Sequence, residues 1–210
     1  MTFPAITALE PDPRRPGTLR VEINGARFGA VPEEVAAAVG LAPGLAVDDE
    51  LRQRLAVAAD EEAAFRTALR SLERRAFAGH DLGRRLRRKG HPGAAVDAAL
   101  ARATALGLLD DAAFAVNYVQ TRTARGRGPS RLAADLMAMG VERSLIDQAI
   151  GAEWNDATDR AGVPRALAET RAAQLGNLPR SVKRRRVLAF LARRGFSGHE
   201  VTDMVGKVVG

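Results

Sequence analysis

The sequence predicts a mainly α-helical protein in which three tandem three-helix repeats form an elongated, curved body, preceded by a small α/β N-terminal region with a β-hairpin. Three observations predict this fold class. From about residue 61 onward, apolar residues recur at steps of three and four, as on one face of a helix. Glycines stand where those helices should end. Four apolar positions recur at the same distances around three of these glycines, which indicates an internal repeat.

The β-hairpin is expected near the start of the chain. Leu19, Val21 and Ile23 alternate with polar residues, as in a half-buried strand. Asn24-Gly25 follows, and both residues tolerate the positive φ that a two-residue hairpin turn requires. Residues 27–31 would supply the return strand.

The rest of the N-terminal region is expected to be short and mixed. Its first residues stay extended because of four prolines, Pro4, Pro11, Pro13 and Pro16. Pro32 then opens a helix over residues 33–39. Asp48 and Asp49 can cap a further helix, which carries Leu51 and Leu55 on one face.

The internal repeat is centred on Leu-x-x-x-Gly segments that end at Gly90, Gly140 and Gly195. An apolar residue stands eight and four residues before each glycine, and again six and ten residues after it. Steps of four lie on one helical face, so each unit is predicted to be a helix, a glycine turn and a second helix. The matching sets are Leu82, Leu86, Val96 and Leu100; Leu132, Leu136, Ile146 and Ile150; and Val187, Leu191, Val201 and Val205.

A further helix is expected in front of each pair and completes the repeat. These helices are predicted at residues 62–77, 111–125 and near 164–176, where Pro164 would be tolerable only at the start. The chain is therefore divided into a head and three repeats, at residues 1–60, 61–108, 109–155 and 156–210. Stacked repeats share a core and offer extended binding surfaces. The alternative is one compact helical bundle with a coincidental periodicity.

The positive charge is concentrated in the repeats. The chain carries a formal net charge of +7. Residues 1–60 hold 6 Arg and 9 acidic residues, whereas residues 61–210 hold 26 Lys and Arg and 16 acidic residues. A basic body favours a polyanionic partner, such as nucleic acid or an acidic protein surface. The alternative is that these arginine-rich helices are only well solvated.

Basic residues gather around the second helix of every repeat, and we take them as candidate contacts to a partner. Arginine binds carboxylates and phosphates through its fork of donors. Because aromatic residues are sparse, we expect any contact with nucleic acid to reach the backbone and to be sensitive to salt. The candidates are Arg84, Arg85, Arg87, Arg88, Lys89, Arg122, Arg125, Arg127, Arg131, Lys183, Arg184, Arg185, Arg186, Arg193 and Arg194.

The residue types that catalysis needs do not form recognisable patterns, and we expect no catalytic, metal or cofactor site. The chain has no Cys, so it offers neither disulfides nor thiolate zinc ligands. His80, His91 and His199 lack metal-binding spacing and are expected at the surface. Asp110 is predicted to be an N-cap. No signal peptide and no membrane-spanning run of about 18 apolar residues is present, so we expect a cytoplasmic protein.

Several stretches resemble the RecX family. The most specific is LGLLDDAAFAVNYVQTR at 106–122, followed by GRGPSRL at 126–132 and DLMAMG at 135–140. KRRRVLAFLARRGF at 183–196 is similar to the family's C-terminal repeat, and residues 68–75 and 82–90 resemble its first repeat. The resemblance covers residues 61–210.

This resemblance implies a regulator of the bacterial recombinase RecA. Members of the family consist of three tandem three-helix repeats, bind RecA, lie in the groove of its filament on DNA, and dampen its ATP hydrolysis and strand exchange. The function implied here is therefore inhibition of RecA in recombination, DNA repair and the SOS response. We expect a monomer without a cofactor, whose first contacts are Arg122, Arg125, Arg127 and Arg131, followed by residues 183–186. Whether the DNA backbone is contacted directly stays open.

Two other functions remain as alternatives. A helix-turn-helix protein that binds duplex DNA without RecA would also have a glycine turn between helices. An enzyme would need polar side chains that converge in a pocket.

Overall fold

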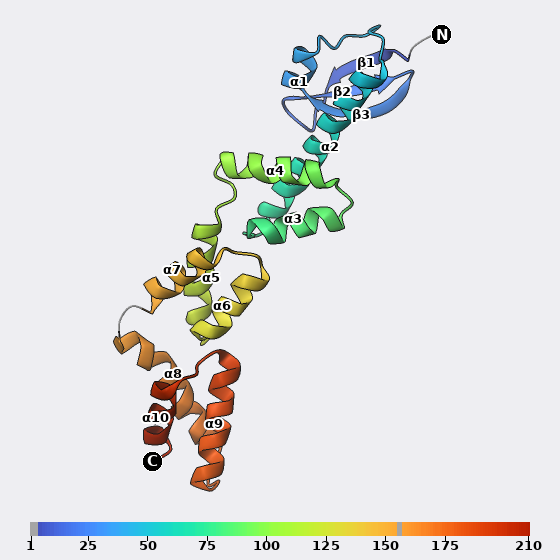
Figure 1. The fold of residues 1–210 in the computed structure, drawn as a ribbon. Helices are drawn as coiled ribbons and strands as arrows, with labels where there is room; N and C mark the ends of the chain where they lie inside the picture. The colour runs from blue at the N-terminus through green and yellow to red at the C-terminus, as the bar shows by residue number, and fades with distance from the viewer. Residues whose placement is uncertain (1–3, 155–156) are drawn as a thin grey trace. The chain divides into compact units, whose positions relative to one another are not determined.

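The computed structural model describes residues 4–154 and 157–210. Within these residues the chain is mainly α-helical, with a three-stranded antiparallel sheet near the N-terminus (Figure 1). The predicted class, helices preceded by a small α/β region, is therefore confirmed. The chain forms two compact units. One comprises the chain up to Phe77 together with Asp81–Leu109, and the other comprises Ala78–His80 and Asp110–Gly210.

The predicted hairpin is present. Strands β2 (Thr18–Ile23) and β3 (Ala26–Pro32) pair antiparallel. They are joined at Asn24 and Gly25, which have φ values of 50° and 74°. These are the left-handed conformations that a tight hairpin turn with the right twist requires.

A third strand, β1 (Ile6–Pro11), was not predicted from the sequence. It pairs antiparallel with β2 at the edge of the sheet. The register shifts between Ile6 and Ala8, and this irregularity breaks the alternation of side chains by which a strand is recognised. Pro11 lies at the last position of the strand, where a missing N–H costs little. The expectation of an extended segment is wrong for Pro13 and Pro16, which lie in the turn between β1 and β2.

Helix α1 (Glu33–Ala38) follows β3, as expected, and α2 (Asp49–Leu72) begins after Asp48, one of the two predicted caps. The Asp48 carboxylate accepts a hydrogen bond from the Leu51 N–H at 2.7 Å. The expected helix at 62–77 is wrong in its bounds, because α2 runs without interruption from residue 49 to residue 72. The proposed boundary at residue 60 therefore falls inside one helix, whereas the division into a head and three repeats stays a prediction.

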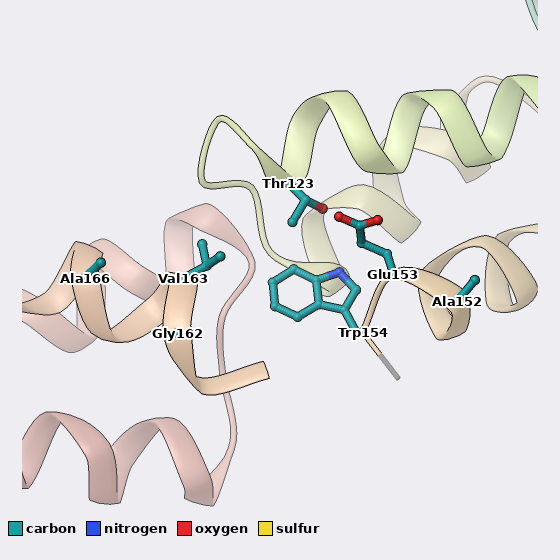
Figure 2. A pocket seen from close by; sticks show the side chains of 7 residues that line it. All are labelled: Thr123, Ala152, Glu153, Trp154, Gly162, Val163 and Ala166. Atoms are coloured by element: carbon teal, nitrogen blue, oxygen red, sulfur yellow. The ribbon is translucent and has the colours of Figure 1, made fainter. Parts of the chain in front are cut away.

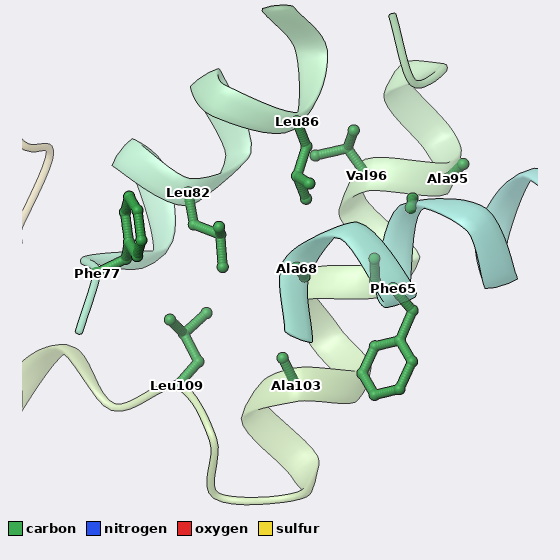
Figure 3. Close-up of a cluster of buried hydrophobic side chains, with 11 residues drawn as sticks. Phe65, Ala68, Phe77, Leu82, Leu86, Ala95, Val96, Ala103 and Leu109 are labelled. Atoms are coloured by element: carbon green, nitrogen blue, oxygen red, sulfur yellow. The ribbon is translucent and has the colours of Figure 1, made fainter. Parts of the chain in front are cut away.

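Helix α2 contributes to two cores. Leu55 and Ala58 pack with the sheet, whereas Phe65 and Ala68 pack with α3 (Gly79–Arg88) and α4 (Gly93–Ala105). Figure 3 shows this second core, in which Leu82, Leu86 and Val96 are fully buried. These are three of the four apolar positions that the sequence pattern predicts for the first repeat.

The positions eight and four residues before the glycine are fully buried in the other two repeats as well. The third fully buried position is six residues after the glycine in the second repeat, as in the first, but ten residues after it in the third repeat. Helices α5 (Asp111–Thr123), α6 (Pro129–Ala138) and α7 (Arg143–Glu153) enclose one core, and α8 (Ala157–Gln174), α9 (Arg180–Arg194) and α10 (His199–Val208) enclose another. The fully buried members of the repeat are Leu132, Leu136 and Ile146 in the first of these cores, and Val187, Leu191 and Val205 in the second. Gly90, Gly140 and Gly195 all have positive φ, as their place at helix ends predicts.

Helix α8 differs from its prediction. It was expected to start at Pro164, but it begins at Ala157 and contains Pro164 in its interior. A proline inside a helix removes one backbone hydrogen bond and strains the preceding turn. Pro164 is buried, so packing against the third core offsets part of this cost. None of the described helices is long and apolar enough to cross a membrane.

Candidate partner-binding surface

The loop between α5 and α6 is shaped by two glycines and a proline. Gly126 has a φ of 74°, which places it in the region that residues with a Cβ rarely adopt. Pro129 occupies the first turn of α6, where its missing N–H has no helical partner anyway. The loop therefore presents Arg125 and Arg127 on either side of Gly126, immediately before α6.

The C-terminal end of α9 docks on this loop. The Gly128 N–H donates to the Arg194 carbonyl at 2.7 Å, and the Ser130 N–H donates to the Gly195 carbonyl at 3.3 Å. The unpaired N–H groups at the start of α6 and the unpaired carbonyls at the end of α9 thus satisfy each other. The approach is close, because a Cβ on Gly128 would lie 2.6 Å from the carbonyl carbon of Gly195.

The Arg194 side chain strengthens this junction. Its Nη1 donates to the carbonyls of Gly126 and Arg125 at 3.3 and 3.4 Å. Its guanidinium lies 4.8 Å from the centre of the Phe190 ring, within the range of a cation–π interaction. Arg194 stays a predicted contact to a partner, and in the structure its side chain also connects the third repeat to the second.

Asp135 organises the arginines of the second repeat. Its carboxylate forms ion pairs with Arg127 and with Arg131 Nε, the latter at 3.1 Å. The Tyr118 hydroxyl donates to the same carboxylate at 3.2 Å. The Arg122 guanidinium lies 5.3 Å from the centre of the Tyr118 ring. One carboxylate therefore holds two guanidiniums directly and a third through tyrosine.

The phenol of Tyr118 responds to these surroundings. Burial raises its pKa above the usual value of 10.0, and the charge and hydrogen bond of Asp135 raise it further. The charges of Arg127 and Arg122 act in the opposite direction. Tyr118 therefore stays protonated at neutral pH and acts as the hydrogen-bond donor to Asp135.

The structure thus brings together five of the predicted residues, which belong to the second and third repeats. We call them the arginine surface: Arg122, Arg125, Arg127, Arg131 and Arg194. Arg125 is exposed and, among the described residues, its side chain has no ion pair. Arg127 and Arg131 remain 39% and 55% exposed despite their contact with Asp135. A partner can therefore reach these guanidiniums while the protein holds them in position.

The remaining third-repeat candidates follow α9. Arg184, Arg185 and Arg186 are exposed and, within the described part of the chain, form no ion pair. Lys183 is half-buried, and Arg193 is exposed next to Arg194. These residues add positive charge to the helix that ends at the arginine surface.

The first-repeat candidates lie on α3 and just after it. Arg84 pairs with Asp81 at 3.0 Å, and Arg87 pairs with Asp97 at 2.7 Å. The Arg85 guanidinium lies 5.8 Å from the centre of the Phe77 ring. Arg88 and Lys89 are exposed. Arg84, Arg85 and Arg87 therefore make contacts within the first repeat, whereas Arg88 and Lys89 are more accessible to a partner.

Sequence reasoning missed Asp135, Tyr118 and the role of the glycines at the junction. The spacing of Arg131 and Asp135, four residues apart on a helix, was a usable signal for that ion pair. No local spacing predicts the pairing of Gly128 with Arg194, because the two residues belong to different repeats.

His80 and His199 are exposed, as predicted, whereas His91 is half-buried, and Asp110 caps helix α5. The Asp110 carboxylate accepts from the Ala113 N–H at 2.9 Å, which confirms the predicted N-cap. His91 Nε2 lies 3.1 Å from Thr67 Oγ1, and His199 Nδ1 lies 3.0 Å from an Asp203 carboxylate oxygen. Among the described residues, no group of three or more His, Asp or Glu side chains is arranged to hold a metal ion.

A cavity of about 640 Å³ lies between α5, the end of α7 and α8. Figure 2 shows Thr123, Glu153 and Trp154 on one side of it and Val163 and Ala166 on the other. The Thr123 hydroxyl is buried and, among the described residues, has no hydrogen-bond partner.

Comparison with known proteins identifies the family. The chain is 38% identical over 148 residues to the regulatory protein RecX of Mycobacterium ulcerans, an alignment that spans 69% of this chain and 84% of that protein.

The chain belongs to the RecX family.

Other comparisons agree with RecX membership. A family model described as the second three-helix domain of RecX matches residues 110–150, which cover α5, α6 and most of α7. The regulatory protein RecX of Geobacillus kaustophilus is 31% identical over 176 residues, spanning 83% of this chain and 64% of that longer protein. A crystal structure of regulatory protein RecX superposes with a TM-score of 0.80 at 24% identity, and the match covers 98% of this chain and 100% of that one. The latter similarity establishes a shared fold.

Proposed function

We propose that this chain binds RecA and the RecA filament on DNA, and that binding lowers ATP hydrolysis and strand exchange in recombination and DNA repair. It acts in the cytoplasm by binding, without catalysing a step. Membership of a family of regulatory proteins supports the regulatory role. The resemblance of residues 61–210 to that family names RecA as the regulated protein.

The arginine surface is the observation that carries the proposal. A filament on DNA offers phosphates and protein carboxylates, which guanidinium groups bind through paired donors. The contacts of Arg194 and Asp135 hold the arginines in place before binding. A surface organised in this way loses less conformational entropy on binding than free arginine side chains would.

Inhibition follows if the bound protein favours one state of the filament. ATP turnover requires RecA subunits to change conformation relative to one another. A ligand that contacts neighbouring subunits and binds one arrangement more tightly shifts the population toward that arrangement. By bridging neighbouring RecA subunits, this basic protein would therefore slow ATP hydrolysis without contacting ATP.

Co-sedimentation tests the binding step. The protein is centrifuged with RecA filaments on single-stranded DNA, with the same DNA alone, and with neither. The proposal predicts recovery in the pellet with the filaments, well above recovery with DNA alone. Recovery that is the same with and without RecA would contradict it.

One feature favours the second candidate, a DNA-binding protein that acts without RecA. Helices α6 and α7 are joined by a short turn at Gly140, which is the connection of a helix-turn-helix motif. A gel shift on duplex DNA of varied sequence, with and without RecA, separates the two functions. Sequence-specific retardation without RecA would favour this candidate.

A further inference from the structure

Helix α9 accounts for the whole net charge of the protein. The chain holds 32 Lys and Arg and 25 Asp and Glu, for a formal net charge of +7. Residues 180–194, which form α9, contain seven of the basic residues and no acidic residue. The rest of the chain therefore holds 25 charged residues of each sign, and the attraction of the protein for a polyanion is centred on this one helix.

The second helices of the other two repeats are partly neutralised by their own acidic residues. In α6 the Asp135 carboxylate pairs with Arg131, and in α3 the Asp81 carboxylate pairs with Arg84. In the described part of the chain, no carboxylate forms an ion pair with a basic residue of α9. The charge of α9 is therefore available to a partner.

Four exposed residues form what we call the outer face of α9: Arg185, Arg186, Ala189 and Arg193. The opposite face carries Val187 and Leu191, which are fully buried in the core shared with α8 and α10 (Figure 1). Arg185 and Arg193 are eight residues apart, which places them about 12 Å from each other along the helix axis. The outer face can therefore contact more than one phosphate, because those of one strand of duplex DNA follow at about 3.4 Å along its axis.

The outer face lacks the side chains that hold a protein partner. The centre of a protein interface is typically made of aromatic and other large side chains that fill pockets. Apart from arginines, the exposed residues of α9 are Ser181, Ala189 and Ala192. Phosphate contacts require only positive charge and hydrogen-bond donors, which Arg and Ser supply, and small alanines allow a backbone to approach closely. Charge complementarity therefore favours nucleic acid over a protein surface.

Helix α9 is held in place before any partner binds. The N–H groups of Gly128 and Ser130 donate to the carbonyls of Arg194 and Gly195 at its C-terminal end. Binding therefore orders only the long arginine side chains and not the helix itself. Because α9 ends at Arg194, its outer face also leads to the arginine surface.

We propose that the outer face of α9 binds the phosphate backbone of DNA, irrespective of base sequence. This inference rests on the proposed function, in which the DNA of the RecA filament is the strand that α9 contacts. The arginine surface would remain available for the carboxylates of RecA.

Removing charge from the outer face tests the inference. Binding to labelled single-stranded and duplex oligonucleotides is measured without RecA, by fluorescence anisotropy at increasing salt. The double variant Arg185→Gln, Arg193→Gln should weaken binding by on the order of tenfold, and the slope of log affinity against log salt should fall by about 1.4 on single strands and about 1.8 on duplexes. The control is Arg52→Gln, Arg54→Gln on α2, which removes the same charge from exposed residues without an ion pair to the described residues and should bind like the wild type.

A conservative variant separates charge from an effect on the helix. Arg185→Lys, Arg193→Lys should keep the salt slope of the wild type, and all three double variants should keep its thermal unfolding midpoint. Loss of the slope in the lysine variant would overturn the inference, as would equal weakening by the α9 and α2 glutamine variants.

The remaining outcomes concern the partner. Binding that depends strongly on base sequence would overturn the inference, and displacement by polyglutamate as effective as by unlabelled DNA would overturn it in favour of an acidic protein. Failure of the wild type to bind either oligonucleotide would overturn it while leaving the proposed function intact. Failure to bind RecA filaments in co-sedimentation, with binding to DNA preserved, would instead overturn the proposed function.

Discussion

The backbone N–H of Gly128, at the start of α6, is hydrogen-bonded to the carbonyl of Arg194, at the end of α9. This bond joins two repeats at the point where their arginines meet. It requires a glycine, since any side chain at residue 128 would collide with the Gly195 backbone. The arginine surface therefore depends on a backbone contact as much as on charge.

Gly128→Ala should loosen this junction. The added Cβ would lie 2.6 Å from the Gly195 carbonyl carbon, and the cost of such overpacking is about 2 kcal/mol. Urea unfolding should show a lower midpoint. The control is Gly206→Ala, which meets open space within α10 and should be neutral or stabilising by about 0.5 kcal/mol. Equal midpoints for the two variants would refute the close contact.

Charge reversal at Arg125 should weaken binding to the RecA filament. Arg125 is exposed in the loop that Arg194 holds, so Arg125→Glu changes the arginine surface without breaking an ion pair of the described residues. Arg54→Glu, on α2, is the control with the same change in net charge, because Arg54 is exposed and, within the described part of the chain, forms no ion pair. Arg125→Glu should lower affinity and reduce its salt dependence, as measured by co-sedimentation at increasing salt. Similar losses in both variants would mean that only net charge matters.

Reversing the charge of both Arg125 and Arg127 should weaken binding further, because Arg127 is on the same surface. If this double variant inhibited RecA ATPase as strongly as the wild type does, both residues would be excluded as contacts.

Asp135→Asn should lower the pKa of Tyr118, because the charge of Asp135 and its hydrogen bond with the phenol both raise that pKa, after burial as the first cause. Tyr118 is the only tyrosine, so the ultraviolet absorbance of tyrosinate reports this one group. A pKa unchanged by Asp135→Asn would show that the carboxylate does not act on the phenol.

The raised pKa of Tyr118 also predicts how stability depends on pH. Above pH 10 the unfolded chain loses this proton while the folded chain retains it, so the unfolded state binds fewer protons. The contribution of Tyr118 to stability is therefore fully present below pH 10 and is lost as the pH rises through the folded pKa. Unfolding midpoints of the wild type and Tyr118→Phe, compared from neutral to alkaline pH, should show the steeper alkaline decline only in the wild type.

Glu62 should anchor the middle of α2. It is 2% exposed and accepts from Arg66 Nε at 2.7 Å and from Arg102 Nη1 of α4 at 3.0 Å. Glu62→Gln weakens both charged hydrogen bonds and should cost about 2 kcal/mol. Its neighbour Glu61 is only half-buried, so Glu61→Gln should change the unfolding midpoint little. An unfolding midpoint that Glu61→Gln lowers more than Glu62→Gln does would contradict a structural role for Glu62.

The sequence predicted the parts of the fold that depend on local pattern. Leu82, Leu132 and Val187 could be recognised as core residues because each stands a fixed number of residues before a glycine, and all three are fully buried. The hairpin at Asn24-Gly25 was predictable because its turn needs particular residues. Strand β1 was missed because the shift between Ile6 and Ala8 hides its alternation.

The candidate site was predictable in its charge but not in its organisation. The arginines could be identified from their positions in the sequence, whereas the contacts that position their side chains join residues far apart in the sequence. Arg194, for example, was predicted only as a contact to a partner, and the sequence did not indicate the contacts of its side chain with Gly126 and Phe190. Sequence spacing does not carry such tertiary contacts, so it could not separate arginines that hold the surface together from those that remain accessible.

RecA ATP hydrolysis on single-stranded DNA, titrated with this protein at two salt concentrations, tests the central claim most directly. The account predicts that hydrolysis falls as the protein is added, and that more protein is needed at the higher salt because the contacts include charged groups. Hydrolysis that stays at the rate of RecA alone across the titration, at both salt concentrations, would contradict it.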